Sequence, residues 1–177
     1  MEYHVNLPLS PDDVRHFRVG DILFVTGTFF TARDKAHKKL VEIKKIPFDP
    51  SAMALYHSGP LMKKTKNRWQ VVSAGPTTSS RMERFENDVI KKYGITLIIG
   101  KAGMGEKTKK ALKKYGAVYT SFPGGAGLVA AKAIVKVPAV YWLRELGMPE
   151  AVWILQVKEF GPLVVAMDSQ GNTLYYR

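Results

Sequence analysis

The amino-acid sequence predicts an α/β fold: a single domain over residues 1–177 with a mostly parallel central sheet and additional β structure at both ends. Three observations support this class. The middle of the chain repeats the order strand, loop, helix, which is typical of parallel sheets with crossover helices. Residues 95–99 form a continuous apolar run, as expected for a strand buried on both faces. The 177 residues, 46% of them hydrophobic, suffice for one compact core.

The first unit begins with residues 21–28, an apolar and β-branched run that predicts a strand. Thr31 and Asp34 then have the spacing of a helix N-cap and the acidic residue that supports it. Apolar residues continue at helical spacing until Pro47, which cannot continue a helix. The pattern predicts a helix over 31–43.

The second unit begins with a short strand at 52–56 and a turn at 57–60. A run rich in lysine at 63–68 has the composition of a basic linker, and residues 69–73 predict another strand.

A loop with four consecutive hydroxyl residues, 77–80, leads into the next predicted helix. Ser80 and Glu83 repeat the capping-box spacing, and apolar residues follow on one helix face. Gly94 stands where a C-cap glycine belongs. The buried strand at 95–99 comes directly after it.

The third unit leads from a glycine-rich loop at 100–105 into a helix at 106–115 and a strand at 117–122. A loop at 123–127 and a small-residue helix at 128–135 follow. Near the C-terminus the pattern predicts two strands and a hairpin turn that leads into a return strand, at 151–157, 163–167, 169–172 and 174–176 respectively.

The chain contains no cysteine, so it cannot form a disulfide or hold a zinc ion or iron–sulfur cluster through its own thiolates. Its four histidines, at positions 4, 16, 37 and 57, show no close pair such as His-x-x-x-His. We therefore expect no metal site built by this chain alone.

The net charge of +12 raises the alternative of a basic nucleic-acid-binding module. Most lysines, however, fall in helix-like runs at 35–45 and 107–114, where they form the polar face of an amphipathic pattern. Neither run contains the aromatic residues that stack on single-stranded bases. We expect no nucleic-acid partner. The sequence also shows no signal peptide and no membrane-spanning run, so the expected location is cytoplasmic.

Cationic side chains follow predicted strand ends in three loops, at 28–33, 75–81 and 100–107. Ligands of open α/β sheets collect beyond the carboxyl ends of the strands, and helix N-termini favour anions there. Arg33, Arg81 and Lys101 could together hold two carboxylates, because guanidinium groups match carboxylates bidentately. The alternative is that each arginine pairs at the surface with a neighbouring carboxylate, Asp34 or Glu83.

Two glycine-rich segments do not fit nucleotide-binding motifs. The segment 100–108 resembles a phosphate-binding loop, but Glu106 stands between the last glycine and Lys107 and would place a carboxylate among the phosphates. The tract 124–127 lacks the spacing of a dinucleotide fingerprint.

Five segments together resemble one known family: Val-Thr-Gly-Thr-Phe-Phe-Thr-Ala-Arg-Asp-Lys-Ala-His-Lys (25–38), Ser-Gly-Pro (58–60), Gly-Pro-Thr-Thr-Ser-Ser-Arg-Met (75–82), Ile-Ile-Gly-Lys-Ala-Gly-Met (98–104) and Gly-Gly-Ala (124–126). They are similar, in the same order, to the β subunit or C-terminal domain of class I fumarases and L-tartrate dehydratases.

This resemblance implies a swivelling β/β/α domain that pairs with an α subunit, as an α₂β₂ complex. Three cysteines of that partner would hold a 4Fe–4S cluster, and this chain would bind no cofactor alone. The implied reaction is the reversible hydration of fumarate to (S)-malate, with L-tartrate dehydration as the alternative.

The resemblance also implies residue roles by motif position. Arg33, Arg81 and Lys101 would bind the carboxylates of a small dicarboxylate, Thr77 would transfer a proton at carbon, and His37 would assist catalysis in the pocket. The same motifs add three residues to the substrate-binding set: Asp34, Gly75 and Thr78. The sequence departs from the commoner family pattern at 29–32 and at Ser79-Ser80, where Ala-Gly is usual, so the choice of diacid stays open.

Overall fold

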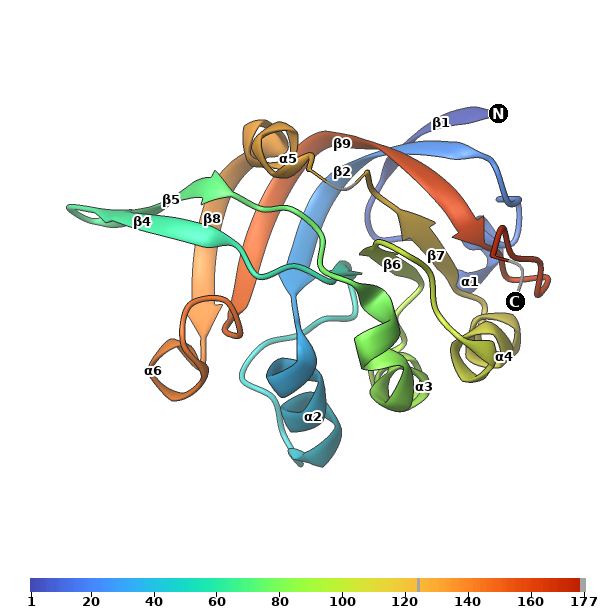
Figure 1. Cartoon of the computed structure of the whole chain (residues 1–177), viewed down its shortest axis with the longest axis horizontal. Helices are drawn as coiled ribbons and strands as arrows, with labels where there is room; N and C mark the ends of the chain where they lie inside the picture. Colours follow the sequence, from blue (N-terminus) through green and yellow to red (C-terminus); the bar gives the residue numbers. More distant parts are fainter. Residues whose placement is uncertain (124, 176–177) are drawn as a thin grey trace.

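A computed structural model describes residues 1–123 and 125–175 (Figure 1). Its strands are β1 (Glu2–Asn6), β2 (Ile22–Thr31), β3 (Met53–Tyr56), β4 (Leu61–Thr65), β5 (Arg68–Ser73), β6 (Leu97–Gly100), β7 (Val118–Ser121), β8 (Ile134–Tyr141) and β9 (Val152–Met167). Its helices are α1 (Pro11–Val14), α2 (Asp34–Glu42), the 3₁₀ turn η1 (Ser79–Met82), α3 (Glu83–Tyr93), α4 (Glu106–Tyr115), α5 (Gly127–Ala133) and α6 (Leu143–Leu146).

One large sheet has the strand order β1-β2-β3-β6-β7-β9-β8, and β4 and β5 form a small sheet of their own. The neighbours from β1 to β7 run parallel, whereas β9 is antiparallel to β7, β8 and β2. Because β9 pairs with both β2 and β7, the strands β2, β3, β6, β7 and β9 close into a ring. The α/β class is confirmed, with a sheet that is mixed.

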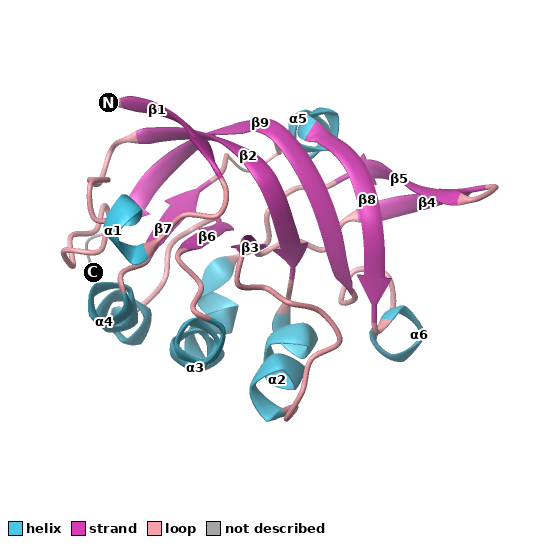
Figure 2. Ribbon diagram, turned by 180° about the vertical axis from the view of Figure 1, so that it is seen from behind, coloured by secondary structure: helices cyan, strands magenta, loops and turns pink. Residues whose placement is uncertain are grey.

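The two faces of the central strands belong to two hydrophobic clusters. Phe29 and Ile99 point into one cluster, while their neighbours Phe30 and Ile98 point into the other, as the alternation of strand side chains requires. The second cluster is covered by α2, α3 and α4, which lie in a row beneath the sheet in Figure 1 and appear in the same row from behind in Figure 2. The crossover helices therefore pack on one face, and α5 packs against the other cluster.

The lysine-rich helices have the predicted solvated face. In α4 the buried residues are Thr108, Ala111 and Leu112, and the lysines lie on the other sides of the helix. Gly94 and Gly116 end α3 and α4 in the left-handed region, with φ of 65° and 71°, so the predicted C-cap at Gly94 is confirmed. None of the described helices is long and apolar enough to cross a lipid bilayer.

The prediction that Thr31 begins a helix is wrong. Thr31 is the last residue of β2 and pairs with Tyr56. Its hydroxyl oxygen accepts a hydrogen bond from the Trp153 backbone N–H at 3.0 Å. The Thr31 hydroxyl therefore forms its hydrogen bond within the sheet and does not cap the helix. Helix α2 begins at Asp34, with Arg33 as its N-cap.

The predicted capping box of Ser80 and Glu83 is also wrong. Ser80 lies within the 3₁₀ turn. The Glu83 carboxylate accepts hydrogen bonds from the Gly105 N–H at 2.7 Å and the Thr108 N–H at 3.1 Å. Glu83 therefore caps α4, the neighbouring helix, whose own N-cap Gly105 has no side chain.

Several strands were not predicted, or were predicted with wrong limits. The basic linker at 63–68 is mostly the β4–β5 hairpin, β1 and β8 were missed, and the two strands expected near the C-terminus are one continuous strand, β9. The Asp168 side chain organises the predicted turn by accepting from the Gln170 and Asn172 N–H groups. The predicted return strand 174–176 and the tract 124–127 fall partly outside the described residues.

Candidate active site

The carboxyl ends of β2, β3 and β6 lie side by side. Tyr56, the last residue of β3, pairs with Thr31 on one side and Ile99 on the other. The chain therefore leaves the sheet at neighbouring points, into Arg33 after β2 and into Lys101 after β6. The predicted convergence of these two loops at one sheet edge is confirmed.

The loop 75–81 reaches the same edge by a different route. It follows β5, which belongs to the small sheet, so it does not extend a central strand as the sequence suggested. Backbone hydrogen bonds attach it: the Thr77 N–H donates to the His57 carbonyl at 2.7 Å, and the Ser79 N–H donates to the Lys101 carbonyl at 3.1 Å. The loop thus lies across the ends of β3 and β6.

Thr77, Arg81 and Asp34 form one cluster from two loops. An Arg81 Nη2–H donates to Thr77 Oγ1 at 2.9 Å, and the same nitrogen lies 3.1 Å from Asp34 Oδ2. The alternative of a surface ion pair between an arginine and Asp34 is therefore realised, and the arginine is Arg81. The Arg81 side chain is 45% exposed, so further N–H groups can reach a ligand.

Arg33 lies against a glycine of the Ser-Gly-Pro motif. A Cβ at Gly59 would stand 2.6 Å from Arg33 Cδ, so a side chain there would displace the arginine. The guanidinium pairs with Glu150, 3.5 Å from Nε to Oε1. Arg33 Nε itself is buried, but the side chain as a whole is 25% exposed, so part of the guanidinium is open to an anion.

Gly75, Thr78 and Lys101 complete the predicted binding set. The Gly75 carbonyl accepts a hydrogen bond from the Ser58 hydroxyl at 2.8 Å, and Gly75 lies against Gly127, where α5 begins. Thr78 forms a parallel bridge with Lys101. The Lys101 ammonium has no ion-pair partner in the described part of the chain. The structure thus places the predicted binding residues in the three loops, except Asp34, which is the first residue of α2. Their contacts with substrate stay predictions.

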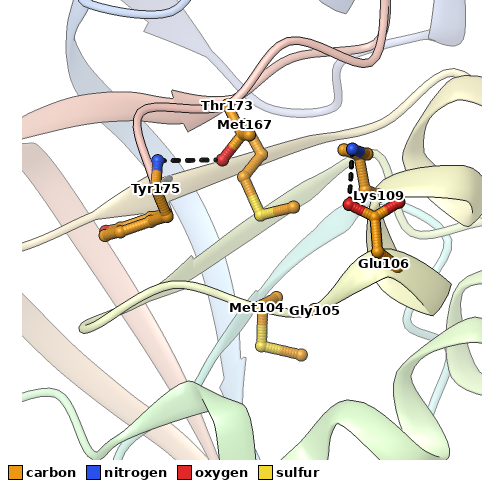
Figure 3. Close-up of a pocket in the computed structure, with 7 residues that line it drawn as sticks. All are labelled: Met104, Gly105, Glu106, Lys109, Met167, Thr173 and Tyr175. Carbon is orange, nitrogen blue, oxygen red and sulfur yellow. Dashed lines mark hydrogen bonds and ion pairs between the residues drawn. The ribbon is translucent and has the colours of Figure 1, made fainter. Parts of the chain in front are cut away.

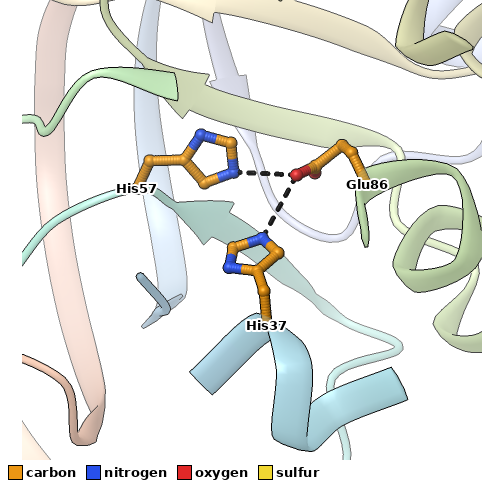
Figure 4. A group of neighbouring side chains, drawn as sticks. All are labelled: His37, His57 and Glu86. Carbon is orange, nitrogen blue, oxygen red and sulfur yellow. Dashed lines mark ion pairs between the residues drawn. The ribbon is translucent and has the colours of Figure 1, made fainter. Parts of the chain in front are cut away.

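A buried group of three side chains lies directly beneath these loops (Figure 4). Glu86 Oε2 is 3.1 Å from His37 Nε2 and 3.2 Å from His57 Nε2, and all three residues have no solvent exposure. His37 Nδ1 also contacts the Arg33 carbonyl at 2.9 Å. His37 is therefore not open to the crevice as expected. Sequence reasoning missed Glu86 and the role of His57, because their spacing matches no motif.

The charges of this group depend on one another. Burial acts to raise the pKa of Glu86, but attraction by the histidine pair outweighs it and lowers the pKa to about 2. Burial lowers the pKa of His57 despite the nearby Glu86 carboxylate, so its ring is neutral at neutral pH.

We predict that this group makes the protein sensitive to acid. The lowered pKa of Glu86 contributes stability that is fully present above about pH 4.5 and lost as the pH falls through about 2. The lowered pKa of His57 adds a loss that begins below about pH 6.5, because only the unfolded chain takes up that proton there. Urea unfolding of wild type and Glu86→Gln at several pH values measures both. An equally steep acid dependence in the variant would contradict the assignment to Glu86.

Ser79 connects the buried group to the third loop. Its Oγ lies 2.9 Å from His57 Nδ1 and 3.0 Å from the Tyr119 hydroxyl, and it accepts the Lys101 N–H at 3.2 Å. A Cβ at Gly100 would stand only 1.8 Å from this oxygen. Gly100 is therefore required for the close approach of the loop to β6.

We expect Gly100→Ala to destabilise the fold by about 1–3 kcal/mol, because the added methyl group displaces Ser79 from a packed site. Ser79→Ala removes the oxygen that the methyl group meets. The double variant should therefore lose less stability than the two single losses together, as measured by urea unfolding. Losses that add in full would show that Gly100 and Ser79 are not in contact.

A separate cavity of about 280 Å³ lies beside the start of α4 (Figure 3). It is lined by Met104, Gly105, Glu106, Lys109, Met167, Thr173 and Tyr175. None of the predicted catalytic or binding residues lines it, so we assign the candidate active site to the strand-end cluster.

Comparison with known proteins points to one family. The family described as fumarase C-terminus matches residues 2–177. The L(+)-tartrate dehydratase subunit beta of Escherichia coli K12 is 43% identical over 175 residues, which cover 98% of this chain and 87% of that protein.

Two further relatives carry provisional names. A Methanocaldococcus jannaschii protein provisionally named L(+)-tartrate dehydratase subunit beta is 48% identical over 99% of this chain and 91% of its own length. A Geobacillus stearothermophilus protein provisionally named fumarate hydratase class I is 44% identical over 95% of this chain and 32% of its own length. The chain belongs to the fumarase C-terminus family.

Proposed function

We propose that the chain is the β subunit of a two-subunit hydro-lyase that hydrates fumarate reversibly to (S)-malate. The observation that carries this proposal is the cluster of Thr77, Arg81 and Asp34 at the sheet edge where Arg33 and Lys101 also emerge. The family and the names of its members support the reaction class.

The cationic side chains account for binding of a dicarboxylate. Arg33 and Arg81 come from separate loops, and their side chains are 25% and 45% exposed although they pair with Glu150 and Asp34. A guanidinium binds a carboxylate through two parallel hydrogen bonds, and the Lys101 ammonium adds a third positive charge. This arrangement favours a small substrate with two negative ends.

Thr77 is the candidate for proton transfer at carbon. During dehydration its hydroxyl oxygen would take the proton from the carbon beside a carboxylate, and during hydration it would return that proton. A threonine hydroxyl is a weak base, but the Arg81 guanidinium, 2.9 Å away, stabilises negative charge on Oγ1. A carboxylate of the partner subunit would take the hydroxyl's own proton as the oxygen accepts the proton from carbon, and would return it in the reverse direction.

His37 has no solvent exposure, so we propose that it assists through the Arg33 carbonyl, which it contacts at 2.9 Å. Asp34 orients Arg81, while the backbone of Gly75 and Thr78 shapes the loop that carries Thr77.

The iron–sulfur chemistry of the reaction would belong to the partner subunit. The donor set of this chain does not fit an iron–sulfur cluster, because the chain has no cysteine. We propose an α subunit whose three cysteines hold a 4Fe–4S cluster, in an α₂β₂ complex. As a swivelling domain, this chain would close its three loops over the substrate by rigid-body motion.

Dehydration of L-tartrate is the second candidate. It is favoured by the names of the Escherichia coli and Methanocaldococcus jannaschii relatives, which match this chain over nearly their whole lengths. Tartrate differs from malate by one hydroxyl group, so the same cationic side chains can bind the two carboxylates of either substrate.

Anaerobic co-expression with the partner subunit, followed by turnover measurements on fumarate, (S)-malate and L-tartrate, tests the proposal. We expect activity only in the complex, with fumarate and (S)-malate interconverted. Preference for L-tartrate would select the second candidate. A complex that turns over none of the three, or an isolated chain that binds nucleic acid with a steep salt dependence even after Arg33→Ala and Arg81→Ala, would reject the hydro-lyase proposal.

A further inference from the structure

Glu86 is the meeting point of the segments that carry the candidate active site. It comes from α3, and it meets His37 from α2 and His57 from the end of β3 (Figure 4). His37 contacts the carbonyl of Arg33, and the His57 carbonyl accepts the Thr77 N–H. A single buried carboxylate therefore connects the Arg33 turn to the Thr77 loop.

The neighbours of His37 determine how many of its ring nitrogens are protonated. A backbone carbonyl can only accept, so the 2.9 Å contact with the Arg33 carbonyl requires a proton on Nδ1. A neutral ring would then leave Nε2 unprotonated at 3.1 Å from Glu86 Oε2, and neither atom has a hydrogen-bond partner among the described residues. Two buried lone pairs at that distance repel each other, so a proton must lie between His37 and Glu86.

His57 needs no second proton. Its Nδ1 lies 2.9 Å from Ser79 Oγ, which can donate its hydroxyl proton there, and the proton of the neutral ring is then on Nε2, 3.2 Å from Glu86 Oε2. The lowered pKa values of His57 and Glu86 agree with a neutral ring and an ionised carboxylate. The extra proton therefore resides on His37.

We propose that Glu86 is a positioning residue of the hydro-lyase: it holds His37 as a buried imidazolium and His57 as a neutral ring, and so fixes the Arg33 turn and the Thr77 loop relative to each other. The positioning part rests on the proposed function. The protonation part rests only on the geometry of the group.

The other charged and titratable groups around this set are consistent with one buried positive charge. Asp34, in the first turn of α2, adds a negative charge close to His57. Tyr119 of β7 faces the set through Ser79, and burial raises the pKa of its hydroxyl, which therefore stays neutral. Tyr175 interacts with Tyr119 from the C-terminal segment.

Two imidazoles and a carboxylate are also donor types that bind zinc. Here Glu86 Oε2 already lies at ion-pair distance from both ring nitrogens, and one imidazolium balances its charge without a cation. We therefore assign a proton rather than a metal ion to the group.

Long-range ¹H–¹⁵N spectra of the full chain, labelled at histidine, test the protonation directly. At neutral pH we expect one buried ring with both nitrogens protonated and one neutral ring with its proton on Nε2. Glu86→Gln should convert the first ring to the neutral form. The matched control is Glu159→Gln, which removes the carboxylate partner of the exposed His4 and should change the His4 titration alone.

Two results would overturn the protonation proposal. One is a wild-type spectrum in which both buried rings are neutral. The other is a stoichiometric metal ion in the purified chain that is lost in Glu86→Gln. The first observation uses only the wild-type chain, so it remains decisive even if the variant folds poorly.

Kinetics of the assembled complex test the positioning role. We expect Glu86→Gln to lower kcat by about 10- to 100-fold, because a small displacement of reacting groups has an effect of that size. KM should change less, and Glu159→Gln should leave both constants unchanged. A folded Glu86→Gln complex with wild-type kcat and pH profile would overturn the role, whereas a wild-type complex with no turnover would count against the proposed function and leave the spectra as the test.

Discussion

Replacement of Thr77 by alanine is expected to reduce kcat of the assembled enzyme by about a thousandfold, within the range for loss of a general acid or base. The backbone N–H of Thr77 keeps its hydrogen bond to the His57 carbonyl, so the loop should hold its position. The effect would therefore come from the lost hydroxyl, which lies 2.9 Å from Arg81 Nη2. Initial rates with fumarate, (S)-malate and L-tartrate measure it.

Two variants serve as controls for the Thr77 prediction. Thr77→Ser keeps the hydroxyl and should retain activity within about tenfold of wild type, because only the placement of the oxygen changes. Ser80→Ala removes an exposed hydroxyl of the same loop and should have little effect. Wild-type turnover in Thr77→Ala would assign proton transfer to another group.

Replacement of Arg81 by alanine is expected to lower kcat/KM by about 100- to 1000-fold, the effect of removing one well-placed donor to a charged substrate group. The change removes both a substrate-binding guanidinium and the donor to Thr77 Oγ1, so we expect kcat to fall as well as KM to rise. It also leaves the Asp34 carboxylate without its ion-pair partner. Steady-state kinetics on the assembled complex separate the two constants.

Arg84→Ala provides the matched control for Arg81. Arg84 lies in α3, three residues along the chain, where its guanidinium stacks on the ring of Phe85. Its loss should leave kcat/KM within about twofold, as expected for a surface substitution. Equal effects of the two substitutions would mean that Arg81 contributes only surface charge.

Local sequence patterns predicted an element well where its conformation depends on its own residues. The run 95–99 predicted a buried strand and Gly94 predicted a helix end, because burial on both faces and left-handed backbone each leave a direct trace in the residue types. Capping patterns failed at Thr31 and Glu83. Both side chains bond to groups distant in the chain, Trp153 and α4, and no local spacing reveals such partners.

Strands were likewise predicted where local patterns define them and missed where pairing with distant segments defines them. The strand β8 follows α5 directly, so the helical pattern before it obscured its start. The strand β9 contains Gly161 and Pro162, residues that normally interrupt strands. Irregular pairing with β2 accommodates them, and a side chain at Gly161 would stand 2.6 Å from the Leu23 carbonyl oxygen. Only the tertiary pairing makes these residues compatible with one continuous strand.

The sequence by itself determined the α/β class, the three loops and the residue types that meet an anion, since motifs and strand ends are local properties. It also determined that the chain supplies no thiolate ligand. Tertiary structure alone decided that Arg81 pairs with Asp34, that Arg33 lies against Gly59, and that Glu86 joins two histidines. These contacts join residues far apart in the chain, and buried polar groups take their partners from whichever strands and helices the fold brings together.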